Sequence, residues 1–147
     1  NSDHPWRCCF SCNMSVPNSP EIFFDERFVG WGPDDWQMAF RLFSKENYKV
    51  HYDADIIAYE IKTAGASNVL LKGGHEKIVQ YLRNLFQFAD ECSTLDPEEL
   101  FWGLRKIKLD TQSNEWNNRE KGDIVKEELT LLIQQARSWL KHHRIYP

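Results

Sequence analysis

Apolar residues recur with a helical period directly after a proline and two acidic residues in the first third of the chain. Pro33, Asp34 and Asp35 suit the first turn of a helix, where proline needs no amide hydrogen and acidic groups face the positive end of the dipole. The apolar positions follow at i, i+3, i+4 and i+7, namely Trp36, Ala39, Phe40 and Phe43. An amphipathic helix is therefore predicted to begin after a boundary at Trp31 or Gly32, with Pro33 in its first turn, and to end near Asn47.

Two longer helices are predicted in the second half of the chain, over residues 75–91 and 123–143, because apolar positions again recur on one face. In the first of these helices the inward positions are Ile78, Val79, Leu82, Leu85, Phe86 and Ala89. In the second they are Ile124, Val125, Leu129, Leu132, Ile133, Ala136 and Leu140.

A further helix is predicted to start at Asp96, because Pro97 and Glu99 complete a helix-start signal. Its apolar stripe is predicted to continue as far as Ile107. Residues 110–122 are polar and predict a loop.

Short apolar stretches in the first part of the chain predict strands at residues 6–16, 48–52 and 56–61. Together with the first helix, these strands predict a mixed α/β region over residues 1–66. The remainder, residues 67–147, is predicted to be an α-helical region. The segment of mostly small and polar residues at 63–74, near this boundary, fits either a mobile lid or a plain linker.

Composition and charge restrict the classes of function. With 147 residues and 41% hydrophobic content, the chain can form one modest domain with a core. Its net charge of -4 argues against a nucleic-acid-binding protein, because such domains are usually strongly basic. No apolar run reaches the roughly 18 residues of a transmembrane helix, and neither an initiator Met nor a signal-peptide pattern is present. We therefore expect a cytoplasmic chain that begins inside a larger protein.

The cysteines leave two interpretations open. Three lie close together and one is distant: Cys8, Cys9, Cys12 and Cys92. A zinc site would need further ligands, for which Cys92 and the pair His142-His143 are available. Reduced thiols in a cytosolic core are the simpler interpretation, and a small Cys/His metal protein is the alternative.

A glycine-rich aromatic turn precedes the first predicted helix. Residues 24–35 read FDERFVGWGPDD, so two adjacent carboxylates follow Trp31 and Gly32. An aromatic surface suits a sugar ring, and a carboxylate within hydrogen-bond reach can take a proton from a hydroxyl group. A helix N-terminus also favours the ionised form of a carboxylate. From these residues alone, an acidic helix start without chemistry is the alternative.

The same segment resembles the acceptor-side motif of inverting GT-A glycosyltransferases, as found in family 2 enzymes and in the galactosyltransferase C-terminal domain. The family pattern is F-D-E-x-F-x-G-W-G-G-E-D, followed by an aromatic residue, Arg and Leu, which residues 40–42 (FRL) match. Upstream, residues 12–16 (CNMSV) resemble the small-Asn-x-Ser segment of these enzymes. The resemblance implies the C-terminal portion of a GT-A fold, an α/β fold with few strands here and an acceptor-site helix, followed by a helical extension.

The resemblance implies transfer of a sugar, with inversion, from a nucleotide-sugar donor to a glycan or other hydroxyl acceptor, as in polysaccharide biosynthesis. It implies that Asp35 is the catalytic general base, and it assigns acceptor contacts to Asp34, Trp31 and Gly32. The chain departs from the family pattern at two positions. Pro33 replaces a glycine and stiffens the turn, and Asp34 replaces a longer glutamate.

These enzymes bind a divalent metal, Mn²⁺ or Mg²⁺, and Glu60 occupies the position of a metal-binding histidine of the family. A carboxylate suits either metal, and a plain strand-end carboxylate is the alternative. The family's donor-binding half carries an Asp-x-Asp upstream of the acceptor motif, whereas residues 53–55 (DAD) lie downstream and are expected to form a polar turn. The chain is therefore expected to be inactive alone and to need an N-terminal nucleotide-binding half as its partner.

Features outside the resemblance leave further alternatives. The basic segment 141–144 (KHHR) either complements the dipole of the last helix or contacts a membrane surface. The helices from residue 75 onward either pack on the catalytic half, form a homo-oligomer or bind the acceptor. The alternative to an enzyme is a non-catalytic helical interaction module of a larger protein, in which the motif survives as scaffold.

Overall fold

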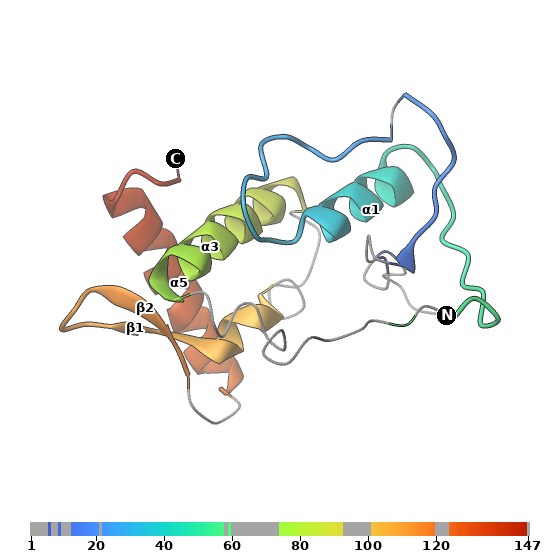
Figure 1. The fold of residues 1–147 in the computed structure, drawn as a ribbon. Helices are drawn as coiled ribbons and strands as arrows, with labels where there is room; N and C mark the ends of the chain where they lie inside the picture. Colours follow the sequence, from blue (N-terminus) through green and yellow to red (C-terminus); the bar gives the residue numbers. More distant parts are fainter. Residues whose placement is uncertain are drawn as a thin grey trace. The chain divides into compact units, whose positions relative to one another are not determined.

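The computed structural model describes Trp6, Cys9 and residues 13–20, 22–57, 59, 74–92, 101–119 and 124–146. Figure 1 shows the helices and strands among these residues: α1 (Asp34–Ser44), α3 (Gly74–Glu91), the 3₁₀ helix η3 (Trp102–Lys106), β1 (Ile107–Asp110), β2 (Glu115–Asn118) and α5 (Lys126–His142). The described part of the chain thus combines helices with a two-stranded antiparallel sheet, which agrees with the α/β expectation at this coarse level.

The chain divides into two compact units. The first comprises Asn1–Phe28 and Pro33–Ser67 and contains α1. The second comprises Val29–Gly32 and Asn68–Pro147 and contains the other helices and both strands. Residues 29–32 of the aromatic turn therefore pack with the second unit, although the chain on either side of them belongs to the first.

Helix α1 confirms the helix predicted after Trp31 or Gly32, with Pro33 at its N-cap and Asp34 as its first residue. Its first helical hydrogen bond runs from the amide of Gln37 to the carbonyl oxygen of Pro33, at 2.9 Å. Trp36 and Phe43, which were expected to point inward, are only half-buried. The buried positions are Gln37, Met38, Ala39, Phe40 and Leu42.

Helix α1 ends at Ser44, earlier than predicted. Asn47 has a left-handed φ of 62°, which an asparagine tolerates better than most residues. A right-handed helix cannot continue through a residue in this conformation. Beyond it, the amide of Tyr48 donates to the carbonyl oxygen of Leu42 at 3.0 Å, so the chain folds back onto the end of the helix.

The strands predicted at residues 48–52 and 56–61 are wrong where the structure describes them. Residues 48–52 and 56–57 have no strand conformation, and Tyr52 is 83% exposed. A strand needs a neighbouring strand to satisfy its backbone groups, and the described residues of the first unit contain none. Residues 58, 60 and 61 lie outside the described part of the chain.

The strand predicted at residues 6–16 is likewise absent from the residues of that segment that are described, namely Trp6, Cys9 and 13–16. Trp6 is instead buried and packs edge-on against Phe40 of α1, with ring centroids 5.6 Å apart. The hydrophobic ring of Trp6 therefore serves the core around α1.

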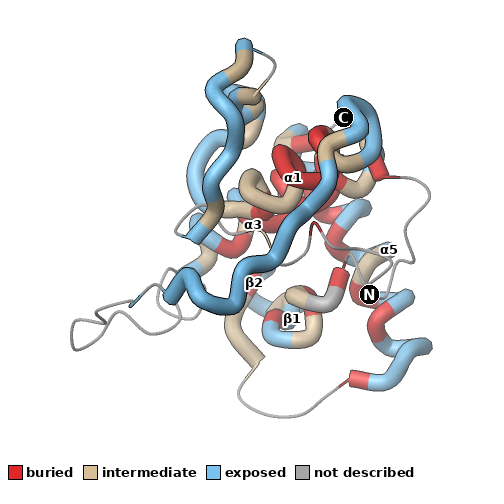
Figure 2. Tube along the Cα trace, turned by 90° about the vertical axis from the view of Figure 1, so that its right-hand side faces the viewer, coloured by how far each residue is buried: buried red, intermediate tan, exposed pale blue. Residues whose placement is uncertain are grey.

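Helices α3 and α5 build the core of the second unit, and their buried stretches are red in Figure 2. Both confirm predicted helices. Helix α3 buries Ile78, Tyr81, Leu82, Asn84, Leu85, Phe86 and Phe88. Helix α5 buries Leu129, Leu132, Ala136, Trp139 and Leu140.

A few residues of these predicted helices are less buried than expected. Val79, Ala89 and Ile133 are half-buried. Val125 is 64% exposed, because its extended backbone places it at the N-cap of α5 and outside the helix. Helix α5 therefore begins at Lys126, later than predicted.

Strands β1 and β2 form an antiparallel hairpin where the sequence predicted a helix end and a polar loop. Ile107 pairs with Asn118 and Leu109 with Trp116, and both Ile107 and Trp116 are fully buried. Asn114 closes the turn with a left-handed φ of 57°. The predictions of helix at Ile107 and of loop at 115–118 are therefore wrong, because burial of the Trp116 ring stabilises a strand in an otherwise polar segment. The predicted helix start at residues 96–99 lies outside the described residues.

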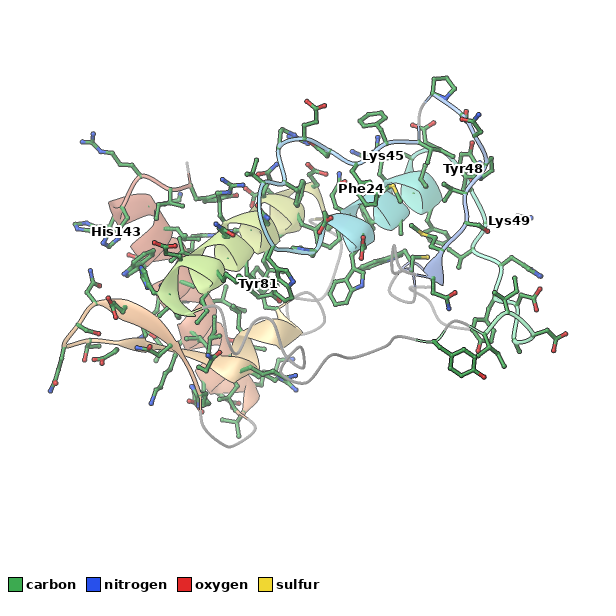
Figure 3. All side chains as sticks on the ribbon, in the orientation of Figure 1. Phe24, Lys45, Tyr48, Lys49, Tyr81 and His143 are labelled. Atoms are coloured by element: carbon green, nitrogen blue, oxygen red, sulfur yellow. The ribbon has the colours of Figure 1, made fainter. Side chains whose placement is uncertain are left out.

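Hydrogen bonds between side chains fasten the hairpin turn to α5. The indole N–H of Trp139 donates to the side-chain oxygen of Asn114 (2.9 Å), and the Asn114 amide donates to Nε2 of His143 (3.2 Å). The Nδ1–H of His143 donates to the carbonyl oxygen of Trp139 (2.8 Å), and the two rings stack with centroids 4.0 Å apart. His143, labelled in Figure 3, therefore links the hairpin turn to the last turn of α5.

Candidate functional site

The turn Val29–Gly32 lies against one face of α3 within the second unit. Gly30 has a φ of 83°, a conformation that side-chain-bearing residues rarely adopt. At Gly32 the reason for glycine is space, because an added β-carbon would lie 2.7 Å from the β-carbon of Asn84. Both glycines of the motif are therefore required by the geometry of the turn and by its close contact with α3.

Trp31, between these glycines, lies on Tyr81 of α3. Their ring centroids are 5.2 Å apart and their planes are tilted by 47°. Tyr81, labelled in Figure 3, is buried, whereas Trp31 is 38% exposed, so the phenol supports the indole and leaves part of it in solvent. Burial raises the pKa of the Tyr81 hydroxyl above its usual range. The turn thus presents an exposed aromatic surface on a buried aromatic base.

Two polar side chains of α3 hold the backbone of the turn. Asn84 is fully buried, and its amide group donates to the carbonyl oxygens of Val29 (3.3 Å) and Trp31 (3.2 Å). Arg83 donates to the same oxygen of Val29 (3.1 Å) and to the side-chain oxygen of Asn84 (3.0 Å). The sequence prediction missed both residues. The available signal was a polar Asn84 among the apolar positions of an amphipathic helix, since buried amides are almost always hydrogen-bonded.

Asp34 and Asp35 lie in the first turn of α1, and both are half-buried. Burial raises the pKa of the Asp34 carboxyl, and the neighbouring charge of Asp35 acts in the same direction. Hydrogen bonds from the amides of Asp34 and Asp35 oppose this rise without cancelling it. The carboxyl group of Asp34 therefore accepts hydrogen bonds from amides at the start of α1 while it is partly desolvated.

The four predicted acceptor-site and catalytic residues are divided between the two units. Trp31 and Gly32 belong to the second unit, whereas Asp34 and Asp35 belong to the first. Pro33, which is buried, joins the two pairs along the chain. The chemistry available is a stacking surface at Trp31 and two carboxylates that can accept hydrogen bonds or a proton.

The chain before the turn is ordered by charged side chains of the first unit. Asp25 accepts hydrogen bonds from the amide (3.0 Å) and Nε (2.9 Å) of Arg27, and Arg27 holds the pKa of the Asp25 carboxyl below its usual value. Arg41 of α1 donates to the carbonyl oxygen of Phe23 and lies over its ring, 4.2 Å from the centroid. Three charged residues of the family-like motif therefore have structural partners close by. Phe24, labelled in Figure 3, is 45% exposed in the same segment.

The predicted metal ligand Glu60 lies outside the described residues, as do Cys8 and Cys12. In the part of the chain that is described, no three His, Cys, Asp or Glu side chains are arranged to hold a metal ion. None of the helices in that part combines the length and the apolar composition needed to span a bilayer.

Comparisons of the chain with models of protein families, with curated proteins and with solved structures give no match. The function is therefore inferred from the residues and the geometry of the turn and of the first turn of α1.

Proposed function

We propose that the chain supplies the acceptor side of an inverting glycosyltransferase, which transfers a sugar from a nucleotide-sugar donor to an acceptor hydroxyl group. The observation that carries the proposal is Trp31, a partly exposed indole that rests on buried Tyr81. The paired carboxylates of Asp34 and Asp35 follow it in the chain. The resemblance of residues 24–35 to the acceptor motif of GT-A glycosyltransferases supports the same interpretation.

In the proposed reaction, Asp35 is the general base. Its carboxylate takes the proton of the acceptor hydroxyl while the hydroxyl oxygen bonds to the anomeric carbon of the donor sugar. The bond from that carbon to the diphosphate oxygen breaks, and its electron pair leaves with the nucleoside diphosphate. Because attack and departure occur on opposite faces of the carbon, the anomeric configuration inverts.

The acceptor contacts are assigned to Trp31, Gly32 and Asp34. The exposed face of Trp31 stacks on the acceptor ring, and the backbone of Gly32 contacts the acceptor, while the space beside its α-carbon is taken by Asn84. Asp34 accepts hydrogen bonds from acceptor hydroxyl groups. A partly desolvated carboxylate gains more from such bonds than one in bulk water, because the local dielectric constant is lower.

Donor binding is assigned to an N-terminal nucleotide-binding half of the family type. A divalent metal, Mn²⁺ or Mg²⁺, would neutralise the diphosphate charge there. The described residues offer no group of three metal ligands, and Glu60 lies outside them. We therefore assign no step of the reaction to a metal bound by this chain.

Sugar binding by the chain itself tests the proposal. Saturation-transfer NMR detects contact between the protein and each of three probes: the methyl β-glycosides of glucose, galactose and N-acetylglucosamine. At least one of them should bind, and Trp31→Ala should remove the signal because the stacking surface is lost.

The matched control is Tyr52→Ala, which removes an aromatic ring that is 83% exposed outside the turn and should leave sugar binding unchanged. A signal that survives Trp31→Ala, or the absence of any signal from the three probes, would contradict the proposed acceptor site. The absence of sugar binding is what a non-catalytic interaction module predicts.

A further inference from the structure

Three hydrogen bonds from α3 end on the backbone of the turn, two from Asn84 and one from Arg83. The bonds from Asn84 reach the carbonyl oxygens on either side of Gly30, those of Val29 and Trp31. A turn that contains two glycines has many accessible conformations when nothing holds it. Fixed hydrogen-bond donors at both carbonyl groups favour one conformation of the turn over the others.

The orientation of the Asn84 side chain is itself determined. Both hydrogens of its amide group are donated to the turn, and its oxygen accepts from Nη2 (3.0 Å) and Nε (3.3 Å) of Arg83. A flipped amide would place its hydrogens against the guanidinium group and its oxygen against two carbonyl oxygens. Asn84 is fully buried, so water does not replace a lost partner easily.

Helix α3 also supports the ring of Trp31 through a side-chain contact. Tyr81 lies one helical turn before Asn84 on the same face and contacts the indole. The backbone of Trp31 is thus held by Asn84 while its side chain rests on Tyr81. Main chain and ring are both set by one helix that lies outside the family-like motif.

We propose that Asn84 is a positioning residue for acceptor recognition, which acts by holding the main chain of Trp31 so that the indole meets the acceptor sugar at a fixed angle. Arg83 supports Asn84 in this role. The inference rests on the proposed function. It assigns a role to α3, which holds the backbone and the ring of Trp31 in place for the acceptor. Small displacements of a stacking group matter because recognition depends on geometry at the ångström scale.

Two variants test the proposal. Asn84→Asp keeps the shape of the side chain but places a carboxylate oxygen against the carbonyl oxygens of Val29 and Trp31, which removes the donors from the turn. Arg83→Met keeps the aliphatic stem of a half-buried side chain and removes the donors to Val29 and Asn84. The milder Arg83→Met variant provides the test if Asn84→Asp does not fold.

Tyr146→Phe is the matched control, because the Tyr146 hydroxyl also bonds to α3. The Tyr146 hydroxyl donates to the carbonyl oxygen of Phe86 (3.3 Å) and to the carboxylate of Asp90, both on α3. Removing it costs α3 hydrogen bonds without touching the turn. Any loss that follows from a weaker α3 alone should therefore appear in Tyr146→Phe as well.

The position of the Trp31 indole N–H cross-peak in a ¹⁵N-correlation spectrum is measured first, assigned by its loss in Trp31→Phe. The peak should move in Asn84→Asp and in Arg83→Met, and it should stay in place in Tyr146→Phe. The dissociation constant for the methyl glycoside that binds best should rise on the order of tenfold in the two turn variants when each protein is fully folded.

An unmoved Trp31 peak in the turn variants, or an equal loss of sugar affinity in Tyr146→Phe at matched stability, would overturn the positioning role. If the wild-type chain binds no sugar, the proposed function fails. The displacement of the Trp31 peak still decides whether Asn84 holds the turn, so the two failures are distinguishable.

Discussion

The indole of Trp31 lies on the phenol of Tyr81, with ring centroids 5.2 Å apart. On the other side, the hydroxyl oxygen of Tyr81 is so close to Gly103 of η3 that an added β-carbon would lie 2.0 Å from it. One buried tyrosine therefore connects the exposed ring of the turn with a 3₁₀ helix far along the chain. The surface proposed for the acceptor depends on packing that extends well beyond its own motif.

Gly103→Ala should destabilise the second unit by about 1–3 kcal/mol, because the new methyl group collides with the Tyr81 hydroxyl in a packed core. Tyr81→Phe removes the colliding oxygen, so the double variant should be more stable than the sum of the two single changes predicts. Urea unfolding of the four proteins measures this coupling, which should exceed about 0.5 kcal/mol. Additive effects of the two substitutions would show that the hydroxyl and Gly103 are not in contact.

Asn114→Gly should lower the free energy of unfolding by about 1–2 kcal/mol, because it removes the amide that links Trp139 to His143. Glycine keeps the left-handed φ of 57° available, so backbone strain does not contribute to the loss. Asn47→Gly is the control, since Asn47 has a similar φ of 62° and is exposed. Equal effects of both substitutions in thermal or urea unfolding would rule out a stabilising role for the hairpin network.

The pH dependence of stability should differ in sign between two aspartates. Burial raises the pKa of Asp34, so the folded state binds its proton more tightly than the unfolded state. Stability from this group is present below the usual value of 3.8 and is lost as the pH rises through the raised value. Asp34→Asn should therefore gain stability relative to the wild type as the pH rises from the usual value of 3.8 through the raised value.

Asp110 provides the opposite case. Hydrogen bonds from the amides of Gln112 and Ser113 lower the pKa of its carboxyl. Stability from Asp110 is present above the usual value of 3.8 and is lost as the pH falls through the lowered value. Asp110→Asn should therefore lose stability relative to the wild type as the pH rises through that window. Urea midpoints measured across the pH range check both signs, and equal signs would contradict the assigned environments.

The helices were predictable because each carries an apolar face with a period that no other element shares. Their ends were less predictable. Asn47 stops α1 through its backbone conformation, and Val125 precedes α5 in an extended conformation, and neither is encoded by hydrophobic spacing. The hairpin was missed because Trp116 is the one large apolar residue in a polar segment, and its burial depends on helices distant in the sequence.

The candidate site was predictable only in part. Residues 31–35 stood out through glycine, aromatic and acidic residues in succession, and the two carboxylates do open α1 as predicted. Asn84 and Arg83 could not be assigned to the turn from sequence, because they lie more than fifty residues away and meet it only after folding. The strands predicted at 48–52 failed because their composition favours a sheet, but no described neighbour pairs with them.

The most direct test of the proposed function is the turnover of the full-length protein with Asp35→Asn. Release of nucleoside diphosphate is measured with UDP-glucose, UDP-galactose, UDP-N-acetylglucosamine and GDP-mannose in the presence of the methyl glycoside that binds. Loss of the general base should lower the turnover number by about 10²–10⁴-fold while the unfolding midpoint stays unchanged. Asp55→Asn, a change at an exposed carboxylate outside the turn and α1, should retain the wild-type rate. A wild-type rate in Asp35→Asn, or no transfer from any of the four donors by the wild-type protein, would contradict the proposal.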